Sequence, residues 1–240
     1  MQTTHAEPYD LVADIGGTNA RFALIGANRQ PCAGQTLTCA DFPDLAAAIT
    51  AYLQTVGEPR PARAAIAVAT PVTGDWIQFT NSPWSFSTEA TRQKLGLERL
   101  LILNDFTALA LALPLLGSDE RRAVGGGTPL ADATIGLIGP GTGLGVSGLV
   151  WSGQRWIPLQ SEGGHVTFSA VDEREWAIGR VLQRQFGHVS PERMLSGPGL
   201  VNLYNALAEV EGWPAEALTP ADLTDRALAV LPVTRAGFQD

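Results

Sequence analysis

Two segments in which short apolar runs flank a glycine-rich turn constrain the fold most. In the first, DLVADI (residues 10–15) and ARFALI (residues 20–25) flank the turn GGTN. In the second, ATIGLIG and GVSGLVW flank the glycines around residue 141. Because an apolar strand pattern rather than a helix pattern follows each turn, both segments are predicted to be β-hairpins.

This strand after each turn separates the chain from the common nucleotide-binding folds. Gly143, Gly145 and Gly148 match the spacing GxGxxG, but a dinucleotide-binding fingerprint requires a helix after the glycines. No Gly-Lys-Ser/Thr occurs, so a Walker A loop is excluded. Glycines permit positive φ and a close approach of an anion to amide N–H groups. The turns are therefore either plain structural turns or phosphate-binding turns.

The rest of the chain repeats an order of strands followed by helices. This order predicts an α/β fold with two domains, residues 1–114 and 115–240. Asp41 is the predicted N-cap of the first helix, with Pro43 in its first turn. Further strands are predicted at residues 34–39, 62–69, 75–80, 100–103 and 155–160, and further helices at residues 87–95 and 106–113 and after Asp172, Ser190, Ser196 and Thr219.

Composition and charge exclude several classes of function. The net charge of −8 makes the chain a poor candidate for binding nucleic acid. Residues 100–117 are apolar enough to mimic a membrane span, but they contain Asn104 and Asp105, and an Asp at a bilayer centre costs about 2.5–3.5 kcal/mol. A strand followed by a helix explains this stretch better. The first residues have no signal-peptide pattern, and two free cysteines fit a reducing compartment, so we expect a soluble cytoplasmic protein.

Three polar groups are candidates for chemistry. Asn104 and Asp105 follow a predicted buried strand, where they could cap a helix or supply the base that a hydroxyl kinase needs. Glu162 and His165 flank two glycines in a loop and could bind sugar hydroxyls, although a lone loop His is more often a solvated surface residue. Glu192 lies in the first turn of a predicted helix, where complementing the helix dipole is the alternative.

Taken in order, these motifs resemble the bacterial glucokinase family of the Escherichia coli type. The resemblance rests on LVADIGGTNARFAL, AVATPVTGDW, TNSPWSFS, LNDFTALALALP, GPGTGLGV, SEGGHVTF and ERMLSGPGLVNLYNAL. It spans residues 10–230 and implies the actin-like ATPase (ribonuclease H-like) fold, with two domains flanking a cleft that closes on the sugar.

The resemblance also implies the reaction and the role of each residue. ATP and D-glucose give ADP and glucose 6-phosphate, and Asp105 is the general base on the glucose 6-hydroxyl. Asp14 would hold Mg²⁺ through water, and a homodimer is implied. The sugar-binding positions are Asn104, Glu162, His165 and Glu192; the ATP-binding positions are Ala13, Asp14, Ile15, Gly16, Gly17, Thr18, Gly141, Thr142 and Gly143.

Two other interpretations remain beside the active kinase. Members of the family extend well beyond residue 240 of this numbering, so a catalytically impaired, truncated sugar-binding remnant or fragment is the alternative. The related repressor–kinase group carries a cysteine-rich zinc motif near its sugar-binding His, and no cysteine lies near His165.

Overall fold

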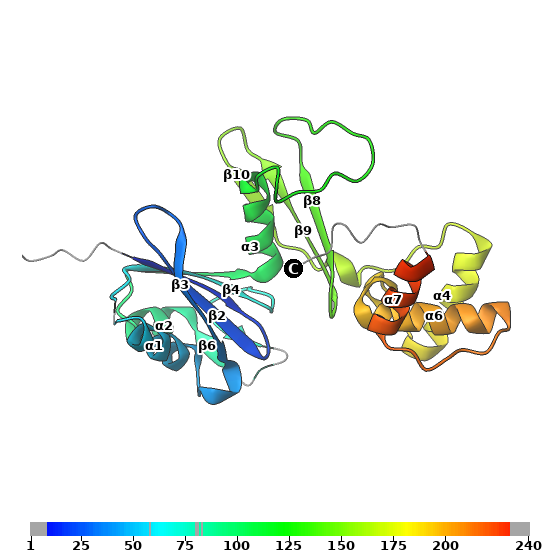
Figure 1. The fold of residues 1–240 in the computed structure, drawn as a ribbon, viewed down its shortest axis with the longest axis horizontal. Helices are drawn as coiled ribbons and strands as arrows, with labels where there is room; N and C mark the ends of the chain where they lie inside the picture. Colours follow the sequence, from blue (N-terminus) through cyan, green and yellow to red (C-terminus); the bar gives the residue numbers. More distant parts are fainter. Residues whose placement is uncertain (1–8, 58, 80–81, 83, 231–240) are drawn as a thin grey trace, which may run out of the picture. The chain divides into compact units, whose positions relative to one another are not determined.

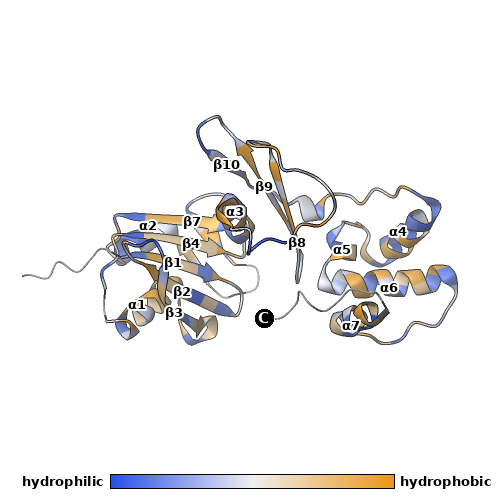
Figure 2. Cartoon of the chain, turned by 45° about the horizontal axis from the view of Figure 1, so that its top comes forward, coloured by the Kyte–Doolittle hydropathy of each residue, from blue (hydrophilic) through white to orange (hydrophobic). Residues whose placement is uncertain are grey.

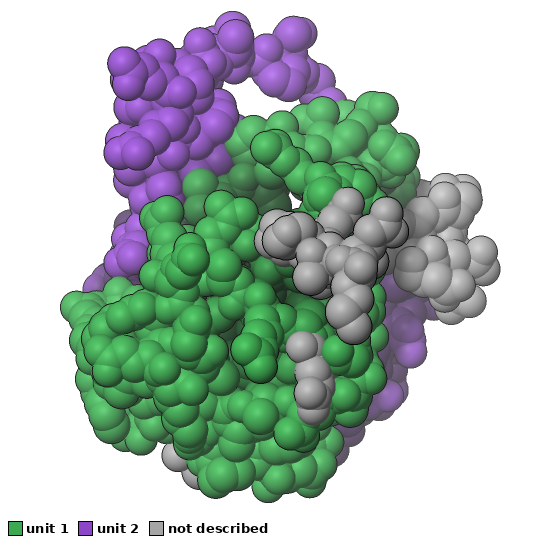
Figure 3. Space-filling model, turned by 90° about the vertical axis from the view of Figure 1, so that its left-hand side faces the viewer, with its two compact units in different colours: residues 1–124 green, residues 125–240 purple. Residues whose placement is uncertain are grey.

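The computed structural model of the chain describes residues 9–57, 59–79, 82 and 84–230 (Figure 1). The chain divides into two compact units, residues 1–124 and 125–240 (Figure 3). Both units combine strands and helices, so the predicted α/β class is confirmed, whereas the domain boundary expected after residue 114 stays a prediction. The N-terminal residues interpreted as lacking a signal peptide, and the end of the strand predicted at 75–80, lie outside the described residues.

Unit 1 is built on a five-stranded mixed sheet with the order β3-β2-β1-β4-β7. β1 pairs antiparallel with β2 through the predicted hairpin and parallel with β4, and β4 pairs parallel with β7. The strands are β1 (Asp10–Ile15), β2 (Asn19–Ile25), β3 (Pro31–Thr38), β4 (Arg63–Val68) and β7 (Arg99–Asn104). A separate antiparallel pair joins β5 (Trp76–Gln78) to β6 (Ser85–Ser87).

Alternate residues of the central strands form one side of the unit 1 core. Leu11, Phe22 and Ile66 are buried and belong to one cluster with Ile49 of α1 (Leu45–Thr55). Burying a side chain of this size contributes about 1.5–3 kcal/mol. Figure 2 shows the apolar character of β4 and β7, but Leu101 of β7 is 41% exposed. Residues 100–103 were predicted to be a buried strand, but in both β4 and β7 the residues alternate between the core and the other face.

The start of α1 differs from the prediction. Asp41 ends a short 3₁₀ turn, η1 (Cys39–Asp41), and does not cap the helix. Asp44 is the N-cap, and its carboxylate accepts the Ala47 N–H at 2.7 Å. Asp41 and Asp44 lie three positions apart, on either side of Pro43, and the η1 turn places Asp41 before the helix. Pro43 consequently precedes α1 instead of lying in its first turn.

The apolar stretch that mimics a membrane span is a strand and a helix, as predicted. β7 leads directly into α3 (Asp105–Ala112), which the short turn η2 (Leu113–Leu115) follows. Among the described residues, no helix is long and apolar enough to span a bilayer. α2 (Thr88–Lys94) lies between β6 and β7 along the chain and begins at the N-cap Ser87.

Unit 2 contains an antiparallel sheet with the order β10-β9-β8 and a group of helices. The second glycine-rich turn joins β8 (Ile135–Pro140) to β9 (Leu144–Trp151), as the hairpin prediction requires, and β10 (Trp156–Leu159) pairs with β9. The remaining elements are η3 (Gly163–His165), α4 (Glu173–Phe186), α5 (Glu192–Leu195), α6 (Gly197–Glu211) and α7 (Pro220–Val230).

Side-chain caps fix the helix starts that the sequence predicts in unit 2. The Asp172 carboxylate accepts the Glu175 N–H at 2.8 Å, and the Ser196 hydroxyl accepts the Gly199 N–H at 3.0 Å. Thr219 and Asp222 exchange bonds across the first turn of α7. These reciprocal contacts satisfy N–H groups that a helix cannot satisfy internally.

Candidate active site

The parallel strands of unit 1 bring three segments to one edge of the sheet. Ile15, Val68 and Asn104 are the last residues of β1, β4 and β7, and they lie in one row of the sheet register. The first glycine turn, Thr70 and Asp105 follow these strands. Adjacent strands lie about 4.8 Å apart, so the turn and Asp105 are separated by about two strand spacings. In many α/β proteins, ligands bind at this edge of the sheet, where the parallel strands end.

The first glycine turn is hydrogen-bonded to Cys39, the first residue of η1. Gly16 donates its N–H to the Asn19 carbonyl at 2.9 Å, and the Cys39 N–H donates to the Thr18 carbonyl at 2.8 Å. The Cys39 thiol also approaches the Gly16 carbonyl at 3.5 Å. Among the described residues, no hydrogen bond engages the amides of Gly17 and Thr18. These amides are available to an anion such as a phosphate.

The residues before the turn belong to strand β1, and only Asp14 among them is exposed. Ala13 and Ile15 pair with β2 on one side and β4 on the other, and the Ile15 side chain is fully buried. Of the six predicted ATP-binding positions in this segment, only the last three lie in the turn. The roles of all six stay predictions.

Asn104, rather than Asp105, caps α3. The Asn104 side-chain oxygen accepts the N–H groups of Phe106 and Thr107 at 3.0 and 3.2 Å. Its amide nitrogen donates to Asp105 Oδ1 at 2.9 Å and lies 3.4 Å from the Thr70 carbonyl. Because Asn104 is the N-cap residue of α3, Asp105 does not have the capping role that was the alternative to catalysis in the sequence analysis.

Asp105 is held through one of its two carboxylate oxygens. Oδ1 accepts bonds from the Asn104 amide and the Phe106 N–H, both at 2.9 Å, whereas Oδ2 has no hydrogen-bond partner among the described residues. Partial burial raises the pKa of Asp105, the Phe106 N–H opposes this rise, and the charge of Asp14 adds to it. A positioned carboxylate with one free oxygen and a raised pKa has the properties of a general base.

Asp14 lies near Asp105 but has a different environment. Its side chain is exposed and forms an ion pair with Arg21 at 2.9 Å, across the β1–β2 register. No group of three or more His, Cys, Asp or Glu side chains suited to a metal ion occurs in the part of the chain that the structure describes. A single exposed carboxylate is compatible with Mg²⁺ only as a hydrated ion that has further ligands from phosphates.

Three predicted sugar-binding side chains gather in unit 2. His165 Nε2 lies 3.8 Å from Glu162 Oε2, and His165 Nδ1 lies 3.6 Å from Glu192 Oε1. Both distances exceed the hydrogen-bond range, so the imidazole and these two carboxylate oxygens face one another with unused bonding capacity. Such a set of acceptors and donors is suited to a polyhydroxylated ligand.

The two glycines between Glu162 and His165 are needed for close packing against β9. A Cβ on Gly164 would lie 2.1 Å from the Leu144 carbonyl oxygen, and one on Gly163 would lie 2.8 Å from a Val146 methyl. The η3 turn therefore rests directly on the strand that follows the second glycine turn.

The second glycine turn is attached to the helices of unit 2. The Gly197 N–H, at the start of α6, donates to the Gly141 carbonyl at 2.8 Å, and the Gly141 N–H donates to the Gly143 carbonyl at the same distance. Gly16, Gly141 and Gly143 do not have positive φ. Of the two uses that turn glycines offer, positive φ therefore does not apply at these three positions. At Gly143 the missing side chain leaves room for the Glu192 carboxylate, since a Cβ there would lie 2.6 Å from Glu192 Oε2.

Several residues around these turns could not be found from sequence patterns. Cys39 and Gly197 donate main-chain N–H groups to the turns, and Leu144 donates its main-chain N–H to Glu192. Every residue type except proline supplies such an N–H group. Only the run Ser196-Gly-Pro-Gly, interpreted as a helix start, pointed to part of this region.

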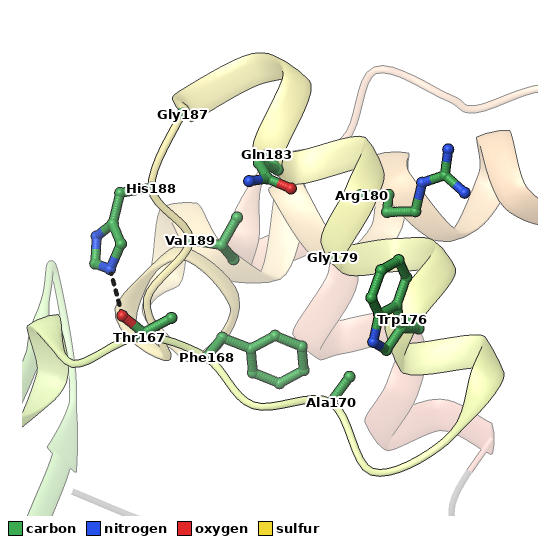
Figure 4. A pocket seen from close by; sticks show the side chains of 10 residues that line it. All are labelled: Thr167, Phe168, Ala170, Trp176, Gly179, Arg180, Gln183, Gly187, His188 and Val189. Carbon is green, nitrogen blue, oxygen red and sulfur yellow. Dashed lines mark hydrogen bonds between the residues drawn. The ribbon is translucent and has the colours of Figure 1, made fainter.

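A cavity of about 240 Å³ lies elsewhere in unit 2 (Figure 4). Phe168, Trp176 and Arg180 line it, and Thr167 and His188 lie 3.2 Å apart at one side. None of the predicted site residues lines it. This cavity and the cluster of Glu162, His165 and Glu192 are therefore separate features.

Comparison with known proteins decides the family. The glucokinase family model matches residues 11–236. The chain belongs to the glucokinase family. It is 50% identical over 232 residues to a glucokinase of Aromatoleum aromaticum, a match that covers 95% of this chain and 70% of that protein.

Solved structures of glucokinases support the predicted actin-like ATPase fold. A glucokinase from an Antarctic psychrotroph matches with a TM-score of 0.83 and 38% identity, over 93% of this chain and 71% of that one. A glucokinase of the ROK family from Streptomyces griseus, solved with glucose and AMPPNP, matches with a TM-score of 0.53 and 19% identity, over 93% and 72% of the two chains. The second match shows the fold alone.

Proposed function

We propose that this chain transfers the γ-phosphoryl group of ATP to D-glucose, giving ADP and glucose 6-phosphate. Membership of the glucokinase family supports the reaction. The observation that carries the mechanism is the Asp105 carboxylate, which is fixed through Oδ1 and has no partner for Oδ2 among the described residues. In the proposed reaction, Oδ2 accepts the proton of the attacking glucose hydroxyl.

The remaining site residues take roles that their contacts allow. Glu162, His165 and Glu192 bind sugar hydroxyls through the oxygens and nitrogens that face one another in unit 2. The amides of Gly17 and Thr18, and the turn Gly141-Thr142-Gly143, bind phosphate oxygens. Asn104 contributes mainly by positioning Asp105, because its side chain is already engaged with α3, Asp105 and Thr70.

ATP and Mg²⁺ are the proposed cosubstrate and ion. The S. griseus glucokinase was solved with AMPPNP, a nucleotide of the same type. Asp14 fits a hydrated Mg²⁺, because its carboxylate is exposed at the edge where the first turn lies. When bound, the ion supplies positive charge that offsets the charge of the phosphates. Binding there competes with the Arg21 guanidinium for the same carboxylate.

Two further expectations belong to this proposal. A homodimer is expected from the family resemblance, and sedimentation of the purified chain tests it. A cytoplasmic location is expected from the free cysteines, Cys32 and Cys39, and cell fractionation tests it.

Glucose-dependent ADP release tests the proposed function. The purified chain is incubated with ATP, Mg²⁺ and glucose, with fructose and mannose as comparison sugars, and glucose binding is measured separately by calorimetry. We expect ADP release that requires glucose. Glucose binding without ADP release would instead support the alternative of a sugar-binding chain that has lost phosphoryl transfer.

A further inference from the structure

The carboxylate of Glu192 is shared between the sugar-facing cluster and the second glycine turn. Its Oε2 accepts the main-chain N–H of Leu144, the residue directly after that turn, at 2.9 Å. Its Oε1 lies 3.6 Å from His165 Nδ1. The side chain is only 26% exposed, so it is held between these contacts instead of extending into solvent.

Gly143 leaves the space that this carboxylate occupies. A Cβ on Gly143 would lie 2.6 Å from Glu192 Oε2 and 3.4 Å from its carboxyl carbon. The atoms of a real side chain do not approach so closely, so any larger residue at position 143 displaces the carboxylate. Gly141, in the same turn, has no atom within 4 Å of the corresponding position.

Leu144 is contacted from its other side by the η3 turn. Its carbonyl oxygen lies where a Cβ on Gly164 would be, at 2.1 Å, and Gly164 directly precedes His165. The main chain of Leu144 therefore lies between Glu192, which binds its N–H, and the turn that carries His165. Gly197 holds the other end of the glycine turn through the Gly141 carbonyl.

We propose that Gly143 is a positioning residue of the glucose site, because it fixes the Glu192 carboxylate between the Leu144 amide and His165. This proposal rests on the proposed function. Gly143, a residue of the proposed phosphate-binding turn, thereby affects the affinity for the sugar. The shared carboxylate also makes the Leu144 amide respond to glucose, since a hydroxyl that donates to the Glu192 carboxylate withdraws charge from the group that accepts the Leu144 N–H.

The variant pair Gly143→Ala and Gly141→Ala tests the proposal. Glucose affinity is measured by calorimetry without nucleotide, so that effects on ATP binding do not enter. We expect at least about a tenfold weaker glucose affinity in Gly143→Ala, about 1.4 kcal/mol, and an affinity within about twofold of the unsubstituted chain in Gly141→Ala, because only the first Cβ meets the carboxylate. Equal affinities of the two variants would overturn the proposal.

A second measurement needs no variant and excludes a general folding defect. In the unsubstituted chain labelled with ¹⁵N, the Leu144 amide signal is followed during a glucose titration. We expect it to shift with the same saturation curve as the calorimetric binding. A Leu144 signal that stays unchanged while glucose binds would refute the coupling. Absence of glucose binding in the unsubstituted chain would instead refute the proposed function, so the two failures are distinguishable.

Discussion

Replacing Asn104 separates its capping role from its contact with Asp105. Asn104→Ala removes the acceptor of the Thr107 N–H and one of the two acceptors of the Phe106 N–H, which keeps Asp105 Oδ1. Loss of an N-cap costs about 1 kcal/mol. The substitution also removes the 2.9 Å donor to Asp105 Oδ1, and a hydrogen bond to a charged group is worth about 1.5–3 kcal/mol. Because Asp105 is only partly buried, we use the lower value and expect Asn104→Ala to lose about 2–3 kcal/mol of unfolding free energy.

Asn104→Ser is the matched control, because Ser caps a helix as well as Asn does but is too short to replace the amide donor. It should recover about 1 kcal/mol of the loss. In both variants the pKa of Asp105 rises further, since the Asn104 hydrogen bond lowers it in the unsubstituted chain. A base with a higher pKa is protonated at higher pH, so the acidic limb of kcat/KM should move toward higher pH in both.

Urea unfolding measures the stability, amide hydrogen exchange at Phe106 and Thr107 reports the cap, and the pH dependence of glucose phosphorylation reports Asp105. Three results would refute the reasoning. One is an Asn104→Ala chain as stable as the unsubstituted chain. Another is an unchanged exchange rate at the Thr107 amide, whose only side-chain acceptor among the described residues is Asn104. The third is an Asn104→Ser chain whose acidic limb coincides with that of the unsubstituted chain.

Three further variants follow from the same contacts. Asp105→Asn should be more stable than the unsubstituted chain at pH 7, because burial raises the pKa of the folded carboxyl above its unfolded value. The gain in unfolding free energy should shrink as the pH falls through the folded pKa, and it should vanish below about pH 3.9. A gain that does not change with pH would contradict this. Gly164→Ala should lose about 1–3 kcal/mol of stability and weaken glucose binding, since its Cβ would lie 2.1 Å from the Leu144 carbonyl oxygen. Gly136→Ala is the control, because its Cβ meets no atom within 4 Å. It should match the unsubstituted chain in urea unfolding. Ser196→Ala should cost about 1 kcal/mol through loss of the α6 cap. Ser196→Thr keeps a hydroxyl that can both accept the Gly199 N–H and donate to the Glu192 carbonyl, so it should retain more stability than Ser196→Ala in urea unfolding. Equal losses in both variants would argue against capping.

The sequence predicted the two hairpins and most elements because their signals are local. Alternating apolar residues and turn glycines lie within ten residues of one another in each hairpin. The N-cap of α1 was predicted three residues too early, because Asp41 and Asp44 both satisfy the local pattern and only the η1 turn distinguishes them. The turn glycines were located correctly. Positive φ, one of the two uses that the sequence suggested for them, does not occur at Gly16, Gly141 or Gly143, and the approach of an anion stays a prediction.

The contacts between the candidate site residues could not be predicted from local patterns. Glu192 and Leu144 are 48 residues apart in the sequence, and the contact uses a main-chain N–H that leaves no trace in residue type. The same applies to the Cys39 contacts with the first turn. The residue types of the site were identified through family resemblance, whereas the way in which one carboxylate serves two segments required the structure.

The rate of ADP release by Asp105→Asn tests the central claim most directly. Asn keeps the shape of the side chain and the acceptor for the Phe106 N–H, but it cannot accept the proton of the glucose hydroxyl. Loss of a general base lowers the rate by about 10²–10⁴-fold. The account predicts a fall in kcat of this size with glucose affinity nearly unchanged. A variant that keeps the kcat of the unsubstituted chain would contradict the assignment of Asp105 as the base.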